Sequence, residues 1–582
     1  MKTIRLRDYG ILPDTDITIS LWKLFKENTR DTEFVFEDGD YYFTPHEEMR
    51  YDYRISNSEV MPYRVLGIWM KEMENCKLTG NGARLYYSGH MQAVTMDHCK
   101  NVTMQGFVID WKKPLVAEGT AVGLGEYYID MYVDPEVFPH RFTGSNIEFD
   151  VGNDEWYPLL QRNCLQYDKE HLCACRVYGN HFVPRSVESL GDNVYRMHCW
   201  EKTNGRPGNV FILRHNMRIH AGIFAEKCEN VTVDDVIVHS CGGLGCLAQF
   251  CHDMTFNRLH FVPNTKAGRS VSSGRDDGFH LTNNSGTVTV SECTFLGLMD
   301  DPINIHSCCC PVESVVDDYT LKCRYGHEEA RGFHYWAEKG DEITLIRRGN
   351  LEQLGKMTAA EYELLDIDTF LLRFSEPIPD DVKEIAESGK LTVDNYSHTA
   401  AFVCRGNRFG SSNARGMLIS TPQSVLVENN YFASSGSPIV IPGDAMYWFE
   451  SGPCHDVTIR NNVFTDVCLS AYYGDCEGII SISPQVPEPD INIPFHTNIC
   501  ITDNVFDTTD TPVLYAYSVK GLTFKNNRIF KSFSGPKWHS ADCKIKLRYC
   551  VDADVSGNCW IGTFGFSNDI VLEGENVNIA TK

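Results

Sequence analysis

A six-residue phrase recurs along this chain and constrains its fold more than any other feature. Most copies begin with a small residue, often Cys, continue through Asn or Asp, and end in alternating β-branched residues. The copies stand at 99–104 (CKNVTM), 228–233 (CENVTV), 251–256 (CHDMTF), 285–290 (SGTVTV), 454–459 (CHDVTI) and 519–524 (VKGLTF). Cys76 and Cys99 are 23 residues apart, and the same spacing separates Cys228 from Cys251. Such a period, rich in Val, Ile and Thr, predicts short strands joined by tight turns, with each repeat forming one coil of a β-solenoid.

The turn residues and the cysteines suit stacked coils. Asn pairs stand at 429–430, 461–462 and 526–527. Asn tolerates left-handed backbone angles and can form a ladder with the coil above. The recurring cysteines would stack about 4.8 Å apart, a spacing that also permits a disulfide. We expect free thiols in an interior ladder, because Cys is a small and readily buried residue.

Other segments depart from the repeat. Residues 14–25 have a cap and helical apolar spacing, followed by strand-like 33–36 and 39–43, which predicts a helix that covers the open end of the solenoid. The phrase disappears in two stretches, which we interpret as small β-rich domains inserted in solenoid loops; a short helix is expected at 359–365. The predicted domains are a cap with the first coils (1–111), a first insertion (112–218), coils with acidic motifs (219–308), a second insertion (309–398) and C-terminal coils (399–582).

Composition excludes some classes of function. The 582 residues carry a formal net charge of −25 without a run of Lys or Arg, which argues against a nucleic-acid partner. No stretch approaches the roughly 18 apolar residues of a membrane span. The 23 cysteines, three of them consecutive at 308–310, and a start without an apolar leader favour a reducing cytoplasm. A secreted or periplasmic location applies if a leader was removed.

The densest polar cluster consists of two acidic motifs, 273–280 (SGRDDGFH) and 298–306 (LMDDPINIH). Asp277 and Asp300 are 23 residues apart, so we expect them one above the other on successive coils. Carboxylates held together push their pKa values apart, which leaves one protonated and another ionised near neutral pH. Acid/base catalysis of glycoside hydrolysis needs such a pair. The competing structural explanation is a calcium site or an Asp ladder in the turns.

The second motif contains two adjacent aspartates. Consecutive strand residues point to opposite faces, so Asp300 and Asp301 can share a site only if the backbone bends. Pro302 favours such a bend, because it cannot donate a ladder hydrogen bond. Asp276 has no comparable feature and is expected to face solvent or to pair with Arg275. The predicted catalytic residues are therefore Asp277, Asp300 and Asp301.

Polar and aromatic residues near these motifs are candidates for binding substrate. Segment 442–450 (PGDAMYWFE) joins two carboxylates to a row of aromatic residues, and sugars are held by aromatic stacking together with polar acceptors. The alternatives are a buried aromatic cluster and structural histidines. The predicted substrate-binding residues are Arg275, His280, Asn304, His306, Asp444, Trp448 and Glu450.

The motifs 6–10 (LRDYG), 274–280 and 299–306 resemble glycoside hydrolase family 110, the α-1,3-galactosidases, which act on blood-group-B-type and related terminal α-galactose. The resemblance covers nearly the whole chain. It implies an all-β fold, a right-handed parallel β-helix with two inserted small β-barrel-like domains. It also implies an inverting mechanism without a metal or nucleotide cofactor. By this resemblance Asp300 is the general acid, while Asp277 and Asp301 hold and deprotonate the attacking water.

Inversion sets a geometric requirement. Its two carboxyl groups are usually about 6.5–9.5 Å apart, whereas adjacent coils are only about 4.8 Å apart. The acid and the base are therefore expected to diverge sideways at the bend before Pro302.

Two other functions remain open from the sequence. One is a polygalacturonase-like hydrolase or polysaccharide lyase on the same fold, although Arg275 is the single obvious base near the aspartates. The other is a non-catalytic glycan-binding solenoid, which has little need for clustered carboxylates. The expected partners are terminal α-galactosyl oligosaccharides or glycoconjugates, linear or fucosylated, and an exposed solenoid flank would suit a homodimer.

Overall fold

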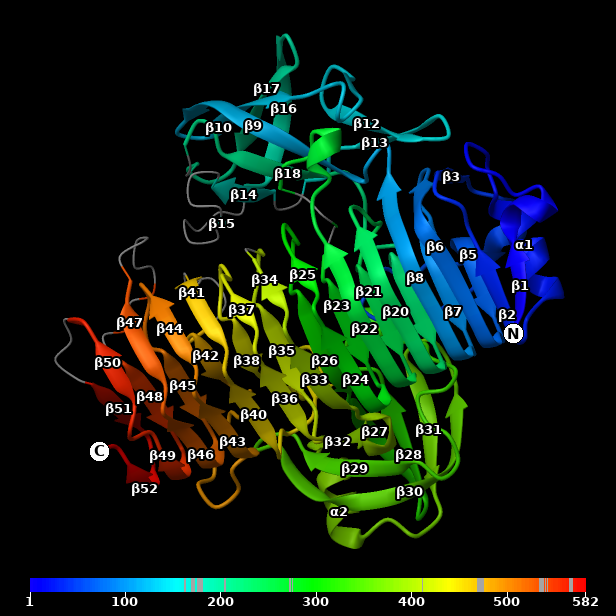
Figure 1. Ribbon diagram of the computed structural model, residues 1–582. Coiled ribbons are helices and arrows are strands. Elements are labelled where there is room, and N and C mark those ends of the chain that lie inside the picture. The colour runs from blue at the N-terminus through cyan, green and yellow to red at the C-terminus, as the bar shows by residue number, and fades with distance from the viewer. Residues whose placement is uncertain are drawn as a thin grey trace.

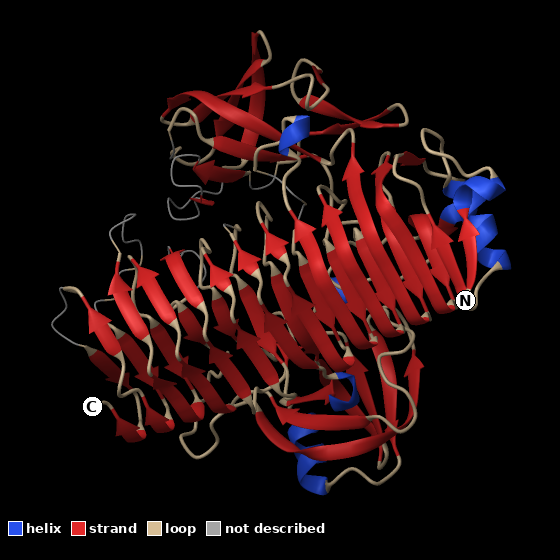
Figure 2. Cartoon of the chain, viewed as in Figure 1, coloured by secondary structure: helices blue, strands red, loops and turns tan. Residues whose placement is uncertain are grey.

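The protein is an elongated parallel β-helix that carries two side domains (Figure 1). The computed structural model describes residues 1–161, 164–168, 173–174, 182–203, 206–271, 274, 276–410, 412–467, 476–532, 539, 541, 543–564 and 569–582. Two long sheets, of 22 and 14 strands, run along the helix axis, and one continuous hydrophobic core lies between them. Figure 2 shows that strands dominate, with the longest helix at the N-terminal end.

The 14-stranded sheet carries the polar pocket described below. Its main path is β4 (Arg50–Tyr51), β5 (Arg64–Lys71), β7 (Gln92–Asp97), β19 (Ile223–Glu226), β21 (Cys246–Gln249), β23 (Phe279–Thr282), β26 (Ile303–Cys308), β35 (Met417–Ser420), β38 (Ile439–Ile441), β42 (Ile480–Ile482), β45 (Leu514–Tyr517), β48 (Ile545–Arg548) and β51 (Ile570–Glu573). Apart from the antiparallel β4–β5 pair, these strands pair in parallel. Apolar side chains such as Phe279 and Ile303 point into the core, and alternate residues point outward.

The 22-stranded sheet displays the sequence repeat directly. Strand β20 (Glu229–Val238) pairs in parallel with β22 (His252–Phe261), so that Val231 lies beside Met254, 23 residues later. Cys99, Cys228 and Cys251 lie at equivalent buried positions on successive coils. The Cys99 amide donates to Cys228 Sγ over 3.3 Å. The predicted interior ladder is confirmed for these three cysteines, whereas Cys76 lies beside Val102 and not beside Cys99. The cysteine side chains that the structure describes are free thiols.

Asparagines form a second ladder, at the turns of the C-terminal coils. The side-chain amide of Asn430 donates to Asn462 Oδ1 over 3.0 Å, Asn462 donates to Asn504 over 3.0 Å, and Asn504 to Asn527 over 3.1 Å. The preceding Asn429, Asn461 and Asn526 have φ of 58°, 55° and 57°, the left-handed region that Asn tolerates. Within each Asn pair, the first residue therefore forms the turn and the second forms the ladder.

The N-terminal segment covers one end of the solenoid. Helix α1 (Thr18–Glu27) is followed by β2 (Thr32–Val35) and β3 (Asp40–Phe43), which begin the coils, as predicted. Leu21, Leu24 and Phe25 are buried in the main core. The end coil is thus shielded by a helix (Figures 1 and 2).

The first insertion contains a seven-stranded antiparallel sheet and a three-stranded one. The sheet order is β15 (Cys173–Ala174), β14 (Leu165–Asp168), β18 (Val210–Arg214), β9 (Val116–Gly125), β10 (Tyr128–Val133), β17 (Val194–Cys199) and β16 (Pro184–Gly191). The smaller sheet comprises β11 (His140–Phe142), β12 (Ile147–Gly152) and β13 (Glu155–Pro158).

The second insertion is a closed six-stranded barrel. Its order is β27 (Cys310–Asp317), β28 (Thr320–Arg324), β31 (Thr369–Phe374), β30 (Glu352–Leu364), β29 (Glu342–Arg347) and β32 (Leu391–Asn395). The helix expected at 359–365 is wrong, because these residues lie largely in β30; the barrel's helix is α2 (Asp380–Glu387). Strand pairing with β29 and β31 overrides the local helical preference.

None of the helices in the described ranges has the length and apolar character required to cross a membrane.

Candidate active site

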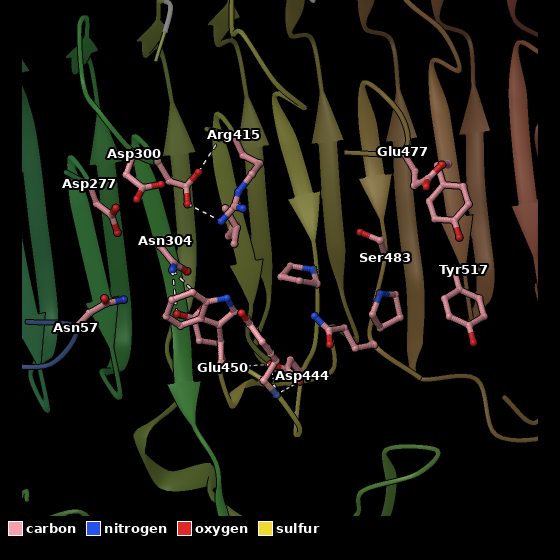
Figure 3. Close-up of a pocket in the computed structure, with 18 of the residues that line it drawn as sticks. Asn57, Asp277, Asp300, Asn304, Arg415, Asp444, Glu450, Glu477, Ser483 and Tyr517 are labelled. Atoms are coloured by element: carbon pink, nitrogen blue, oxygen red, sulfur yellow. Dashed lines mark hydrogen bonds and ion pairs between the residues drawn. The ribbon is translucent and has the colours of Figure 1, made fainter. Parts of the chain in front are cut away.

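A pocket of about 910 Å³ lies over the outer face of the 14-stranded sheet, around β23, β26 and the coils after them. Figure 3 shows Asp277 and Asp300 toward one end, Asp444 and Glu450 between, and Glu477 and Tyr517 toward the other end. Its described lining includes Asn57, Arg218, Asp277, Asp300, Asp301, Asn304, Arg415, Asp444, Tyr447, Trp448, Glu450, Glu477, Tyr515, Tyr517 and Arg548.

Strand register places the acidic motifs on successive coils. Phe279 of β23 pairs with Ile303 of β26, and Ile303 pairs with Met417 of β35. The residues two positions before each of these, Asp277, Asp301 and Arg415, therefore occupy equivalent positions. The expected stacking of Asp277 on Asp300 is wrong by one residue, because this coil is 24 residues long: Asp277 stacks on Asp301, and Asp276 on Asp300.

The three aspartates meet in one cluster. The chain bends at Asp300 and Pro302, and one carboxylate oxygen from each of Asp277, Asp300 and Asp301 lies within 4.8 Å of the others. Asp277 and Asp301 are buried, whereas the side chain of Asp300 is 30% exposed. Burial raises the pKa of Asp277 well above its usual value, and the nearby Asp300 and Asp301 add to this.

Two arginines supply the opposing charge. Arg415 donates from its backbone N–H and from Nη2 to the two oxygens of Asp301, both over 2.8 Å. Arg218 lies 3.2 Å from Asp276 and 3.8 Å from Asp300. Burial opposes the charge of Arg218, but Asp276 and Asp277 outweigh it and raise the pKa of Arg218 above its usual value. Asp276 thus faces a guanidinium, and Arg275, its expected partner, lies outside the described residues.

The predicted histidines lie behind the carboxylates. His280 on β23 is fully buried and His306 on β26 is 5% exposed; neither borders the large pocket. His280 Nδ1 lies 3.0 Å from Asp277 Oδ2. Asn304, in contrast, borders the pocket and donates to both oxygens of Glu450, over 3.3 and 3.2 Å.

Asp444 organises the aromatic segment beside the pocket. Its carboxylate accepts hydrogen bonds from the backbone N–H groups of Met446, Tyr447, Trp448 and Phe449. This turn holds Trp448 at the pocket with 44% of its surface exposed, and its ring lies 4.4 Å from that of His327. Trp448 therefore presents an exposed aromatic ring to the pocket.

Sequence reasoning missed several lining residues. Arg415 is detectable in principle: Asp301 and Arg415 are 114 residues apart, and removal of the 90 residues at 309–398 leaves 24, one coil. Arg218 and Asn57 carry no comparable signal. Arg218 is the last residue of the predicted first insertion and donates to Asn57, which belongs to a loop that precedes β5.

The parallel β-helix and its pocket of clustered carboxylates beside an exposed Trp together define a glycoside hydrolase. The family model described as GLAA-B beta-barrel domain II matches residues 320–385, within the closed barrel. Alpha-1,3-galactosidase B of Bacteroides thetaiotaomicron is 34% identical over 569 residues, which cover 96% of this chain and 91% of that protein. The chain therefore belongs to the alpha-1,3-galactosidase family.

Other relatives agree. Alpha-1,3-galactosidase A of Bacteroides fragilis is 29% identical over an alignment that covers 90% of this chain and 86% of that protein. Among solved structures, the A-module of the Azotobacter vinelandii mannuronan C-5 epimerase AlgE4 has a TM-score of 0.41 at 9% identity, with 99% of each chain covered. That similarity is too low to bear on function.

Proposed function

We propose that this protein is an exo-acting α-1,3-galactosidase, which removes terminal α-1,3-linked galactose from glycans. The observation that carries the proposal is the cluster of Asp277, Asp300 and Asp301 within 4.8 Å, at the wall of a pocket that also presents Trp448. Membership of the alpha-1,3-galactosidase family supports the substrate.

Hydrolysis of a glycosidic bond needs a proton donor for the leaving oxygen and an acceptor for the proton of water. Asp300 is proposed as the acid, because its side chain is the most exposed of the three and can reach the leaving oxygen. Asp277 and Asp301 are proposed to hold and deprotonate the water. Arg415 donates two hydrogen bonds to Asp301 and places a positive charge beside its carboxylate.

The proposed inversion does not rest on the usual spacing of carboxyl groups. The nearest oxygens lie within 4.8 Å, below the range of about 6.5–9.5 Å for inverting pairs. It rests on the water site: two acceptors that hold one water at about 2.8 Å with a tetrahedral angle are about 4.6 Å apart. Asp277 and Asp301 have a separation compatible with one bridging water.

The pocket also bears on the alternative substrates. Three arginines of the described residues line it. Arg218 and Arg415 already contact the site's own carboxylates and are thus not free to bind the uronate groups of an acidic polymer. Arg548 lies at the far tyrosines, 4.7 Å from the centre of the Tyr517 ring. Tyr515 and Tyr517 extend the lining along the coils after the aspartates, which provides room for the sugars next to a terminal galactose (Figure 3). We propose blood group B-type glycans, and linear α-1,3-galactosides as further substrates.

The test is a proton NMR time course on blood group B trisaccharide and on a linear α-1,3-galactoside, with Asp277→Asn and polygalacturonate as controls. We expect β-galactose first, no release by the variant, and intact polygalacturonate. Early α-galactose would keep the substrate and overturn inversion. No galactose from either glycan would overturn the proposed function, and cleavage of polygalacturonate would favour the lyase or polygalacturonase alternative. The homodimer stays a prediction, which light scattering on the purified protein tests.

A further inference from the structure

A line of close polar contacts leads from Asp277 into the protein and returns to the pocket. His280 Nδ1 lies 3.0 Å from Asp277 Oδ2, and His280 Nε2 lies 3.0 Å from His306 Nε2. His306 Nε2 lies 3.5 Å from Glu450 Oε1. Asp277 and Glu450 both border the pocket, whereas the two imidazoles do not. The line therefore joins two points of the pocket through buried rings.

The sheet holds these groups in place. His280 and His306 lie on adjacent strands β23 and β26, at outward positions that alternate with the buried Phe279 and Ile305. Glu450 belongs to β39 (Glu450–Ser451), which pairs antiparallel with Cys308 and Ser307 at the end of β26. Asn57 Nδ2 lies 3.5 Å from His280 Nε2, the same nitrogen that contacts His306. Strand pairing thus fixes the order Asp277, His280, His306, Glu450.

The neighbours restrict the positions of the protons. His306 Nδ1 lies 3.1 Å from the Ser307 carbonyl, which can only accept, so this nitrogen carries a hydrogen. Two arrangements then satisfy the contacts that run from Asp277 through His280 to His306, and the first also lets His280 Nε2 accept from Asn57. In one, His306 is an imidazolium whose Nε2–H donates to His280, and His280 Nδ1–H donates to the Asp277 carboxylate. In the other, protonated Asp277 donates to His280 Nδ1, and His280 Nε2–H donates to neutral His306.

We propose that His280 and His306 form a proton relay. The relay removes the proton that Asp277 accepts from the attacking water. The inference rests on the proposed hydrolase function. The two arrangements contain the same number of protons and differ by one concerted shift. The O–H bond of Asp277 breaks as an N–H bond forms at His280 Nδ1, and the N–H bond at His280 Nε2 breaks as one forms at His306 Nε2.

The exit of the proton completes the cycle. His306 passes its Nε2 proton to Glu450 Oε1, which loses it to water in the pocket. The vacated His306 Nε2 then accepts the proton that leaves Asp277 through His280. Each step exchanges one O–H or N–H bond for another, so no oxidant, reductant or further reactant is required. Asp277 is again a carboxylate, but His280 now carries its hydrogen on Nδ1. Before the next turnover His280 returns to the Nε2–H tautomer by gaining one proton from water at Nε2 and losing one to water at Nδ1.

The surrounding charges suit each group to its task. Burial, together with His306 and Arg218, lowers the pKa of His280 well below its usual value, so this ring changes tautomer without holding charge. Burial opposes protonation of His306, but Glu450, Cys308 and the Ser307 carbonyl outweigh it and raise the pKa of His306 to about 9. Asp394 also faces His306, and Asp276, Asp300, Asp301 and Arg218 surround Asp277. Asp277 and His306, the two neighbours of His280 in the relay, thus have raised pKa values.

The experiment compares His280→Gln and His306→Gln with His496→Gln, a control that removes an equally buried imidazole on another strand. On blood group B trisaccharide, we expect each relay variant to lower kcat by about 10- to 100-fold with little change in KM. Wild type and control should show a curved proton inventory in H₂O/D₂O mixtures, because several protons move together. The relay variants should show a linear one while circular dichroism remains native.

Two results would overturn the relay: wild-type kcat with a curved inventory in His306→Gln, or a loss confined to KM, which indicates a substrate contact. A readout without substrate separates the relay from the proposed function. In proton NMR, one downfield imidazole N–H signal should disappear in both relay variants and shift in Asp277→Asn, but persist in His496→Gln. If wild type releases no galactose, the proposed function fails. Absence of such a shared signal would disprove the relay, whether or not galactose is released.

Discussion

Arg415 donates two hydrogen bonds to Asp301, each of 2.8 Å, although 114 residues separate them in the chain. The second insertion interrupts the solenoid between these residues, so they lie on adjacent coils. The side chain of Asp301 is 4% exposed and that of Arg415 is 15% exposed. The pair is thus nearly desolvated, and removal of one partner leaves the other charge buried.

Arg415→Met tests this pair. We expect the free energy of unfolding to fall by about 3–5 kcal/mol, because Asp301 keeps a buried charge without its guanidinium. Arg460→Met is the control: Arg460 is 48% exposed and pairs with Glu428 at the surface, which is worth less than about 1 kcal/mol. Urea unfolding followed by circular dichroism measures both. Equal losses would show that the Asp301 pair has no special role.

Asp300→Asn tests the proposed role of Asp300 as the general acid. It should lower kcat on blood group B trisaccharide by about 10²–10⁴-fold while substrate binding survives. On an aryl α-galactoside the loss should be much smaller, because a good leaving group departs without protonation. Asp277→Asn should lose activity on both substrates, since the water still needs a base. A wild-type rate of Asp300→Asn on the trisaccharide would disprove the acid role.

The crowded carboxylates should reduce stability. Burial, with Asp300 and Asp301, raises the pKa of Asp277, so the folded protein holds a proton that the unfolded chain releases above about pH 4. The unfolded state then binds fewer protons, and stability falls as pH rises from about 4 toward the folded pKa. Asp277→Asn should therefore melt a few degrees higher than wild type at pH 7.5, with a smaller difference at pH 4.5. Melting curves of both proteins at the two pH values measure this difference. An equal rise in melting temperature at both pH values would contradict this explanation.

Trp448 should act in binding. Trp448→Ala removes the exposed ring at the pocket, and we expect KM to rise about tenfold with kcat changed less than about threefold, because stacking stabilises ground and transition states alike. Tyr127→Ala is the matched control, since Tyr127 is 46% exposed on the first insertion. Initial-rate kinetics on the trisaccharide measure both variants. A loss in kcat alone would place Trp448 in the chemical step.

Cys99→Ser should lower the stability of the folded protein and leave kcat unchanged. The Cys99 thiol is buried in the ladder, and a hydroxyl is more costly to bury there, so we expect a loss of about 1–3 kcal/mol in unfolding free energy. Cys559→Ser, at an exposed thiol, should be neutral. Urea unfolding and kcat are the measurements. Selective loss of activity in a stably folded variant would contradict a purely structural ladder.

Sequence by itself determined the coil, the cysteine and asparagine ladders, the N-terminal cap, the two interruptions and the meeting of acidic motifs. These features depend on a local pattern that recurs along the chain, with 23 residues between equivalent positions in several coils, and each copy indicates the same strand and turn. Only the tertiary structure decided that Asp277 stacks on Asp301, because one residue more in that coil shifts the register. It alone brought Arg218 and Asn57 to the aspartates, and placed His280 and His306 behind them. These contacts join loops and faces of different coils, and packing between distant segments leaves no periodic signal along the chain.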